Sequence, residues 1–200
     1  MFHSCQGKIS PVAAEKPAAG RGVPMVVRSV RSACDSGRFD FVGVSSDDQT
    51  ILTLAEGAGA VPLQRDAALC GDDVRAKDVV WEHLREMDRR FDYVALFMNT
   101  NPFRTAEHAR EAFDLIVARG ARTLVSVNEF ENSPGLAMKI QKGRLRHYYN
   151  KNMDWLRESE FPVGYCLNGA IFIGQYDYFM ENRTFLEDGT VPYIMDRMGS

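Results

Sequence analysis

The sequence predicts an α/β fold in which a mixed, mainly parallel β-sheet is flanked by helices. Short apolar runs of strand length alternate with helical patterns of about 10–15 residues, which is typical of βαβ units. Several of these runs are apolar throughout, as expected of strands buried on both faces. The composition is that of a globular protein, with 45% apolar and 26% charged residues. The length of 200 residues suits one domain, and we expect it to cover residues 1–200.

Charge and cysteine usage exclude several classes of protein. The 24 Lys and Arg against 27 Asp and Glu give a net charge of −3, which argues against a nucleic-acid partner. Apolar runs of about 18 residues, as needed to cross a bilayer, are absent from the sequence, and residues 1–10 lack the apolar centre of a secretory signal. The cysteines are far apart without a C-x-x-C motif, which argues against disulfides or zinc. We therefore expect a cytoplasmic protein with no membrane partner.

The chain begins with a segment unlike the rest. Residues 1–24 are rich in Ala, Gly, Pro and Lys, and they are predicted to form a loop. A helix follows, because apolar residues recur at spacings of three and four from Val23 to Cys34. Pro24 suits its first turn and Gly37 can end it. The compact apolar run 39–44 then predicts a strand.

The next elements continue the alternation. Residues 49–57 are predicted to form a helix with Asp47 as its N-cap, and residues 60–62 form a short strand. Asp72 or Asp73 opens another helix. Its buried face carries Val79, Val80, Leu84 and Met87.

Three further elements complete the first half of the chain. Residues 93–98 are apolar throughout and predict a fully buried strand. A helix begins at Thr105 and ends at Gly120, which suit the N-cap and the C-terminal turn. Residues 124–127 predict another strand. Strands that alternate with helices in this way favour parallel pairing.

The second half has a different pattern. Residues 137–140 and 145–148 flank Lys142-Gly143 and predict a β-hairpin. A polar and aromatic stretch follows, which we interpret as an excursion from the sheet at about 147–162. Residues 169–173 predict the final core strand, and a helix follows at 176–181.

Aromatic and histidine residues leave alternatives open. Five aromatic residues could form a sugar-stacking or dimer surface, or they could simply be core residues; they are Tyr148, Tyr149, Trp155, Phe161 and Tyr165. Three histidines lack the spacing of a metal site and are expected to serve no metal; they are His83, His108 and His147.

Candidate site residues follow from the rule that ligands bind beyond the carboxyl ends of parallel strands. The polar segments in question are residues 45–48, residues 98–104 and the loop after Val127. Arg104 could clamp a carboxylate or phosphate through two N–H groups, or it could tie its own loop to a carboxylate. Thr100 and the neighbouring Asn101 could bind a ligand, but turn formation explains them equally well.

Other residues carry weaker signals. Asp47 and Asp48 suit helix capping better than metal binding. Lys8 lies beside a glycine and could meet a phosphate as a point charge, or it could be a solvated loop residue. The pair Asn168-Gly169 permits an unusual turn that leaves the Asn amide free for a ligand, or it is a plain turn before a strand.

Several short segments, in this order, resemble the acylneuraminate cytidylyltransferases. Residues 42–48 (V-G-V-S-S-D-D) are similar to the family's V-V-V-S-T-D-D, and residues 97–104 (F-M-N-T-N-P-F-R) to its L-Q-P-T-S-P-L-R. The segments T-L-V-S-V and G-R-L, at 123–127 and 143–145, also fit. Residues 165–172 (Y-C-L-N-G-A-I-F) are similar to Y-R-x-N-G-A-I-Y, and residues 190–195 (T-V-P-Y-I-M) to T-x-P-Y-V-M.

This resemblance implies a fold of nucleotide-diphosphosugar-transferase type and a homodimer, with the excursion at about 147–162 in dimerisation. The implied reaction joins CTP to a nine-carbon or similar sugar acid to give a CMP-sugar and pyrophosphate. Mg²⁺ is the implied cofactor. Lys8 would touch phosphate as the catalytic residue, and Ser45 and Asp47 would lie near the nucleotide. The sugar-acid side would be held by Thr100, Arg104, Tyr165, Asn168 and Gly169.

The sequence departs from the family pattern at several positions. Ser4, Ala13 and Ala14 stand where the N-terminal loop carries cations or a Lys-Asn pair. Met98 replaces the Gln that meets the sugar acid, and Cys166 replaces an Arg. The family's metal-binding D-x-D is expected just beyond the last residue given. These departures motivate an alternative, a catalytically impaired homologue that binds nucleotide or sugar; a structural dimer module is a third.

Overall fold

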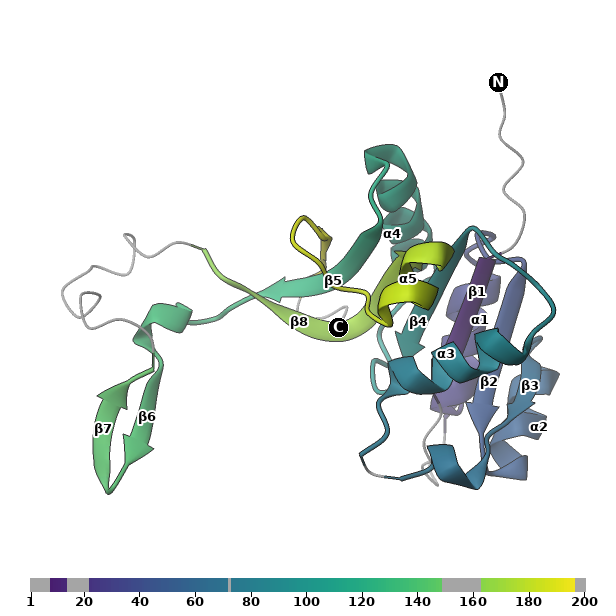
Figure 1. Cartoon of the computed structure of the whole chain (residues 1–200), viewed down its shortest axis with the longest axis horizontal. Coiled ribbons are helices and arrows are strands. Elements are labelled where there is room, and N and C mark those ends of the chain that lie inside the picture. Colours follow the sequence, from purple (N-terminus) through teal and green to yellow (C-terminus); the bar gives the residue numbers. More distant parts are fainter. Residues whose placement is uncertain (1–7, 14–21, 72, 149–162, 197–200) are drawn as a thin grey trace.

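The centre of the protein is a seven-stranded mixed sheet with the order β3-β2-β1-β4-β8-β5-β9 (Figure 1). The computed structural model describes residues 8–13, 22–71, 73–148 and 163–196. The strands of this sheet are β1 (Lys8–Ala13), β2 (Phe41–Ser46), β3 (Val61–Gln64), β4 (Tyr93–Met98), β5 (Thr123–Glu129), β8 (Tyr165–Gln175) and β9 (Val191–Ile194). The helices are α1 (Met25–Cys34), α2 (Gln49–Gly57), α3 (Ala76–Glu86), α4 (Ala106–Arg119) and α5 (Tyr176–Asn182).

The prediction of a mainly parallel sheet is confirmed. Strand β1 pairs in parallel with β2 and β4, β2 pairs in parallel with β3, and β5 pairs in parallel with β9. Strand β8 is the exception, because it lies antiparallel between β4 and β5. Residues 169–173 were predicted to form the final core strand. This prediction is wrong, because they belong to the longer β8, from Tyr165 to Gln175, and β9 follows it.

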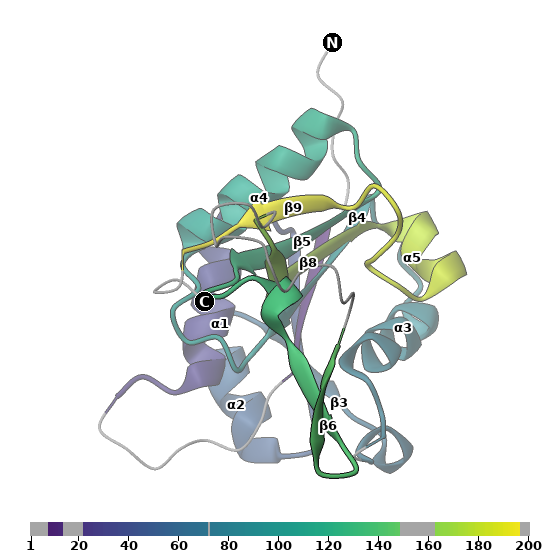
Figure 2. The same ribbon diagram turned by 90° about the vertical axis from the view of Figure 1, so that its left-hand side faces the viewer.

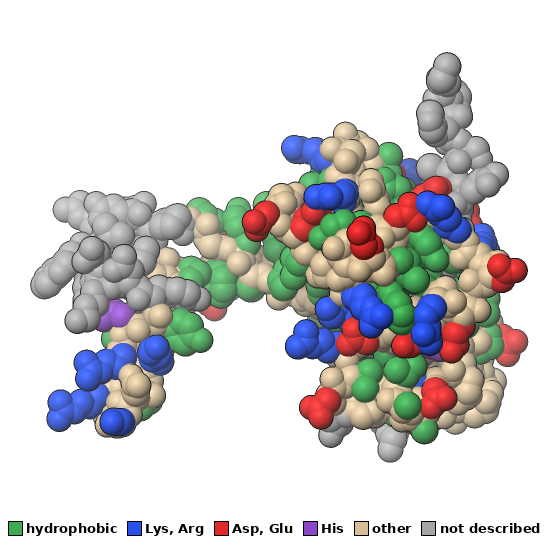
Figure 3. All heavy atoms as spheres, viewed as in Figure 1, with side chains coloured by type: hydrophobic (Ala, Val, Ile, Leu, Met, Phe, Trp, Pro, Cys, Tyr) green, Lys and Arg blue, Asp and Glu red, His purple; other side chains and the backbone are tan. Residues whose placement is uncertain are grey.

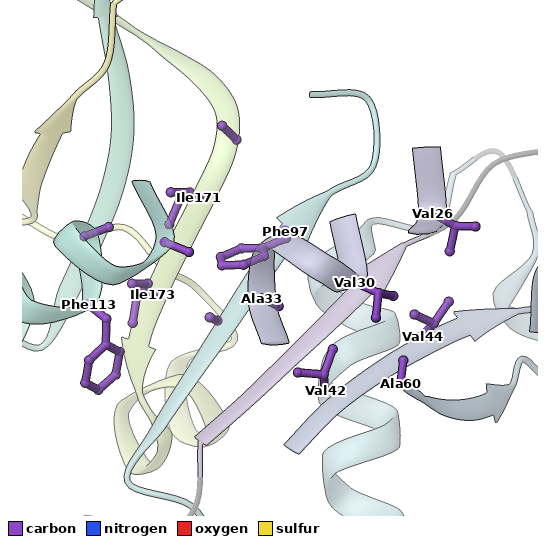
Figure 4. Packing of buried hydrophobic residues seen from close by; sticks show 14 of the residues in the cluster. Val26, Val30, Ala33, Val42, Val44, Ala60, Phe97, Phe113, Ile171 and Ile173 are labelled. Atoms are coloured by element: carbon purple, nitrogen blue, oxygen red, sulfur yellow. The ribbon is translucent and has the colours of Figure 1, made fainter. Parts of the chain in front are cut away.

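Helices cover both faces of the sheet. In Figure 2, α1, α2 and α4 lie on one side of the strands, and α3 and α5 lie on the other. The strands therefore bury both of their faces, as in β4, where Ala95 and Phe97 pack with the first helix layer and Val94 and Leu96 with the second. Figure 4 shows the larger cluster, in which Phe97 lies between α1 and β8. This two-sided burial explains why the strand sequences are apolar throughout.

The prediction that residues 1–24 form a loop is wrong for β1, which occupies the middle of the sheet. Residues 8–13 read K-I-S-P-V-A, in which Pro11 lacks the N–H that a central strand needs. Pairing on both sides outweighs that missing bond, since Pro11 aligns with Gly43 of β2 and Val12 aligns with Phe97 of β4. The other residues before 22 lie outside the described part of the chain.

Most of the remaining elements occur where they were predicted. The bounds of α2 and β4 are confirmed, and α4 is capped by Thr105 and ended by Gly120 in the left-handed conformation, with φ 57°. The predicted cap of α2 is wrong. Asp48, not Asp47, caps α2 by accepting a hydrogen bond from the amide of Thr50 at 2.7 Å.

The predicted start of α3 is also wrong. Helix α3 begins at Ala76 after Arg75, three residues beyond Asp73; Asp72 lies outside the described residues. A 3-10 turn at Ala67–Leu69 precedes it, and this turn is capped by the side chain of Asp66. Every helix in the described residues falls short of the length and apolar character needed to cross a membrane.

Residues 128–129 of β5 and 165–166 of β8 pair with each other and extend beyond the sheet as a projection, here called the arm (Figure 1). The predicted hairpin is confirmed beyond it as β6 (Met138–Gln141) and β7 (Arg144–His147), after the 3-10 turn Pro134–Leu136. Lys142 and Gly143 both have positive φ, 52° and 70°, which suits a two-residue hairpin turn. Lys and Arg side chains gather on this hairpin in Figure 3. Most of the predicted excursion at 147–162 lies outside the described residues.

Candidate functional site at the carboxyl edge of the sheet

Two adjoining cavities lie at the carboxyl ends of the parallel strands. The first, here called the edge cavity, has a volume of about 200 Å³ and is lined by Arg65, Met98, Asn99 and Thr100 among others. The second, here called the apolar cavity, has a volume of about 430 Å³. Its lining includes Arg75, Lys77, Met98, Gly169, Phe172 and Phe185. Ala76 and Met98 line both cavities, so the two spaces meet at the end of β4.

The edge cavity contains a guanidinium that β2 holds in place. Arg65 directly follows β3, and its Nη2 donates to the backbone carbonyl of Ser45 at 2.7 Å. Its Nε donates to the Ser45 hydroxyl at 3.1 Å. The same hydroxyl lies 2.8 Å from Nε2 of His83, on α3. Burial is the main cause that lowers the pKa of His83 below its ordinary value of 6.5.

Two of the predicted nucleotide-side residues, Ser45 and Asp47, lie at or just beyond the end of β2. Ser45 is buried and sits one residue before the end of β2, where it meets Arg65 and His83. Asp47 is exposed beyond the same strand end. Neither lines the two cavities, so Ser45 touches them only through Arg65.

The loop after β4 supplies one exposed polar residue, Thr100, and two buried ones, Asn99 and Asn101. Thr100 is exposed and lines the edge cavity. Asn101 is buried and donates its amide N–H to the backbone carbonyl of Asn168 at 3.1 Å. Asn99, also buried, accepts a hydrogen bond from the Ser29 hydroxyl at 2.9 Å. These bonds tie the loop to β8 and α1, and they leave Thr100 as its accessible hydroxyl.

Arg104 is buried and lines a separate cavity of about 540 Å³, and its predicted role in holding the sugar acid stays a prediction. Its side chain is 5% exposed, and its Nη1 donates to the carbonyls of Met98 and Ala170 at 2.9 and 2.8 Å. Its Nε donates to the Ser32 hydroxyl at 3.3 Å. Burial lowers the pKa of Arg104 to about 9, which leaves it charged at neutral pH. Among the described residues, its Nη2 is the buried side-chain polar atom that lacks a hydrogen-bond partner.

The amide of Asn168 is also engaged within the protein, and the prediction that it is free for a ligand is wrong. Its Oδ1 accepts hydrogen bonds from the Ser126 hydroxyl at 2.5 Å and from the Ala170 amide at 3.0 Å. Its Nδ2 donates to the side-chain carbonyl of Asn128. Gly169 has a φ of 76°, which allows β8 to turn beside the apolar cavity.

Tyr165 and Lys8 lie away from the cavities. Tyr165 pairs with Glu129 on the arm and is 45% exposed, and Tyr148 is exposed as well, so neither is a core residue. The backbone of Lys8 pairs with Tyr93 at the amino end of β4, whereas Ala13 pairs with Met98 at the carboxyl end. Five residues of strand separate these ends by about 16 Å. The prediction that Lys8 lies in a loop is therefore wrong, while its contact with phosphate stays a prediction.

Sequence reasoning missed the cations that line the cavities. Arg65 and Arg75 stand at element ends, and Lys77 donates from Nζ to the Arg183 carbonyl at 2.7 Å. The rule that selected residues 45–48 applies equally to Arg65, since it follows a parallel strand. The short strand β3 obscured that signal. Arg75 and Lys77 come together with Met98 only through the packing of α3 on the sheet.

The described residues do not provide a metal site. Within the described ranges, no group of three or more His, Cys, Asp or Glu side chains is placed to hold a metal ion. Mg²⁺ therefore stays an expectation from the resemblance, since it is commonly held by one or two carboxylates together with substrate phosphates.

Comparison with known proteins identifies the family. Residues 21–173 match the protein family described as Cytidylyltransferase. An N-acylneuraminate cytidylyltransferase of Streptococcus agalactiae strain NEM316 is 27% identical over 177 residues, which are 87% of this chain and 42% of that protein. The chain thus spans less than half the length of that relative. A CMP-N,N'-diacetyllegionaminic acid synthase of Legionella pneumophila is 28% identical over 88% of this chain and 77% of its own length.

Solved structures support the same fold. A CMP:2-keto-3-deoxy-manno-octonic acid synthetase complexed with CTP has a TM-score of 0.66 at 12% identity, covering 96% of this chain and 90% of its own. A 2-C-methyl-D-erythritol 4-phosphate cytidylyltransferase of Francisella tularensis has a TM-score of 0.66 at 10% identity, covering 98% and 93%. The fold expected from the resemblance is therefore correct. Because the family match extends over well more than half of the 200 residues, the chain belongs to the cytidylyltransferase family.

Proposed function

We propose that the protein activates a sialic-acid-type sugar acid with CTP, giving a CMP-sugar and pyrophosphate. The observation that carries the proposal is the pair of adjoining cavities that meet at Met98. The edge cavity has Arg65 on its wall, and the apolar cavity has Arg75 and Lys77 on its rim. A site for two anionic reactants needs cations near both of them, because the reactants otherwise repel each other.

The edge cavity is the proposed nucleotide site. Arg65 uses two of its five N–H groups on Ser45 and keeps the others for a ligand. Thr100 and residues 69–71 also line this cavity. Similar proteins include a CMP-N,N'-diacetyllegionaminic acid synthase and a sugar-acid synthetase complexed with CTP, which supports a cytidine nucleotide here.

The apolar cavity is the proposed sugar-acid site. Arg75 is exposed just before α3, and Lys77 is half-buried two residues later; both line the cavity. A carboxylate can pair with either of them. The remaining wall is largely apolar, with Met98, Phe172, Phe185 and Leu186. Such a wall favours deoxy and acyl groups on the substrate over free hydroxyl groups, which it would leave without partners.

The proposed reaction is an in-line transfer between the two cavities. A hydroxyl oxygen of the sugar acid attacks the α-phosphorus of CTP and forms a new P–O bond. The bond from the α-phosphorus to the bridging oxygen breaks, and pyrophosphate leaves with its electron pair; the hydroxyl proton passes to solvent. The protein contributes by positioning two anions and by neutralising their charge. Mg²⁺ is the expected activator of such a transfer.

A second copy of the chain is the proposed partner, through the arm and the β6–β7 hairpin. A two-stranded hairpin is marginally stable by itself, and this one exposes Ile140 by 78% and Leu145 by 66%. Exposed apolar side chains on a projecting element favour burial against another chain. The same proposal assigns the excursion at about 147–162 to dimerisation.

The alternative function is nucleotide or sugar binding without turnover. Met98 and Cys166 favour it, because the family pattern has polar residues at both positions. The deciding assay supplies CTP, Mg²⁺ and a panel of nine-carbon and eight-carbon sugar acids, and it measures pyrophosphate release. Pyrophosphate release with one acid supports activation. Thermal stabilisation by CTP without release from any acid would favour the binding protein instead.

A further inference from the structure

The Ser45 hydroxyl lies between two nitrogen groups of different chemistry. Nε of Arg65 approaches it at 3.1 Å, and Nε2 of His83 approaches it at 2.8 Å. Ser45 is 2% exposed and His83 is 9% exposed. The three residues come from three elements, since Ser45 is on β2, Arg65 follows β3 and His83 is on α3. Only Arg65 reaches the edge cavity.

The direction of each hydrogen bond follows from the donors available. A guanidinium can only donate, so Arg65 occupies one lone pair of the hydroxyl oxygen. The hydroxyl proton of Ser45 then needs an acceptor, and Nε2 of His83 is the group placed to accept it. A neutral imidazole accepts at Nε2 only if its proton is on Nδ1. In this tautomer, the Arg65 Nε–H donates to the Ser45 oxygen and the Ser45 O–H donates to His83 Nε2.

We propose that His83 is a positioning residue for the nucleotide site, which acts through Ser45 to fix the guanidinium of Arg65 toward the edge cavity. The inference rests on the proposed nucleotide role of that cavity. In the neutral state, His83 orients the Ser45 hydroxyl so that its lone pair faces Arg65. Protonated His83 would become a second donor to the same oxygen and a second cation beside the guanidinium. The arrangement is therefore competent only while the imidazole is neutral.

The charges around the imidazole determine the direction of the pH effect. Arg65 disfavours the protonated ring, whereas Glu82 and Glu86, on the same helix as His83, favour it. Burial is the largest influence and disfavours protonation. The imidazole is consequently neutral at neutral pH. Nucleotide affinity should therefore fall only when the pH drops below the ordinary histidine pKa of 6.5.

The test compares two substitutions of His83 with the unchanged protein. His83→Gln keeps an acceptor near the position of Nε2, and His83→Leu removes it at a similar volume. His108→Gln, a half-buried histidine on α4 outside the cavities, is the matched control. CTP affinity is measured by calorimetry at about pH 8 and about pH 5. CTP titrates identically in every mixture, so differences between variants report the protein.

Two results are expected from calorimetry. His83→Leu should weaken CTP binding about tenfold at the higher pH, as for one lost orienting hydrogen bond. The unchanged protein and His108→Gln should lose about tenfold more affinity than His83→Gln on acidification. Equal affinities and equal acid losses in all four proteins would overturn the proposal.

NMR gives a readout that needs no nucleotide. Long-range ¹⁵N–¹H correlations should place the His83 proton on Nδ1, and the Nε–H signal of Arg65 should be protected from exchange at the higher pH and lost in Ser45→Ala. A proton on Nε2 at neutral pH would overturn the proposal even if His83→Leu fails to fold. Correct NMR signals without any CTP binding by the unchanged protein would refute the proposed function and leave the positioning chain intact.

Discussion

The guanidinium of Arg104 lies over the ring of Phe97, with its central carbon 4.4 Å from the ring centroid. Phe97 is fully buried in β4, so this charge sits against the core, at the wall of a cavity of about 540 Å³ that Arg104 lines with Arg31. Together with its bonds to the Met98 and Ala170 carbonyls, the contact joins the end of β4 to β8. Arg104, which the sequence alone suggests as a ligand-binding residue, thus helps to hold β4 and β8 together.

Arg104→Met should therefore reduce stability far more than it changes ligand contacts. The substitution leaves two buried carbonyls without their donor, which we expect to lower the free energy of unfolding by about 3 kcal/mol. Urea unfolding measures this loss, with Arg119→Met on the exposed end of α4 as control. Unchanged stability together with a large rise in the KM for the sugar acid would restore Arg104 to the binding site.

Gly169→Ala should strain the turn of β8 beside the apolar cavity. The φ of 76° is unfavourable for any residue with a Cβ, and the added carbon would meet Asn101 Oδ1 at an ordinary 3.8 Å. The penalty is thus one of backbone strain, and we expect about 1–2 kcal/mol. Chemical denaturation tests it against Gly57→Ala in α2, where the added Cβ meets open space. Equal stability changes at the two positions would contradict the strain argument.

Met98→Gln should change the choice of sugar acid. Met98 lines both cavities, and a Gln there would offer hydrogen bonds to substrate hydroxyls that the thioether does not. We expect the ratio of kcat/KM for a polyhydroxylated acid over a deoxy, acylated acid to rise about tenfold, as for one hydrogen bond. Competition between the two acids measures this ratio. A fall in the ratio would mean that the apolar wall does not select the substrate.

Ile140→Asp and Leu145→Asp should convert a dimer to a monomer. Both side chains are highly exposed on the hairpin and would be buried by a second copy. A charge in that interface must lose its water, which is strongly unfavourable without a partner. Analytical ultracentrifugation gives the mass, and Lys142→Gln in the turn is a control that leaves the apolar residues intact. A monomeric unchanged protein would exclude the homodimer.

His83 should also contribute to the pH dependence of stability. Its folded pKa lies below the ordinary 6.5, so the unfolded chain binds more protons between these two values. The free energy of unfolding therefore falls as the pH drops through that window. His83→Gln should make this part of the profile flatter than in the unchanged protein. A steeper profile in the variant would show that the pKa is shifted in the opposite direction.

The elements that were predicted correctly have local signals. The unbroken apolar run of β4, the Thr105 and Gly120 boundaries of α4, and the Lys142-Gly143 turn each depend on a few neighbouring residues. Strand β1 was missed because its sequence is only weakly apolar and includes Pro11. The strand is instead stabilised by its pairing with β2 and β4. Such pairing is not visible in a single segment.

The site was only partly predictable for a related reason. The carboxyl-edge rule selected residues 45–48 and 98–104, which do lie at that edge of the sheet, but it could not distinguish a side chain that faces a ligand from one that holds the fold. Asn168 and Arg104 belong to the second kind, because their partners come from residues distant in the sequence. Arg65 also follows a parallel strand, but β3 is only four residues long and was a weak signal. The cavity that Arg65 lines is formed together with residues of α3 such as Val79, which are distant in the sequence.

The central claim is that the two cavities hold CTP and a sugar acid side by side. Calorimetry with CTP on the unchanged protein, Arg65→Met, Arg75→Met and the control Arg119→Met tests it most directly. The account predicts that Arg65→Met weakens CTP binding at least tenfold, while Arg75→Met and Arg119→Met bind CTP as the unchanged protein does. CTP binding that is equally strong in Arg65→Met, or absent from the unchanged protein, would contradict it.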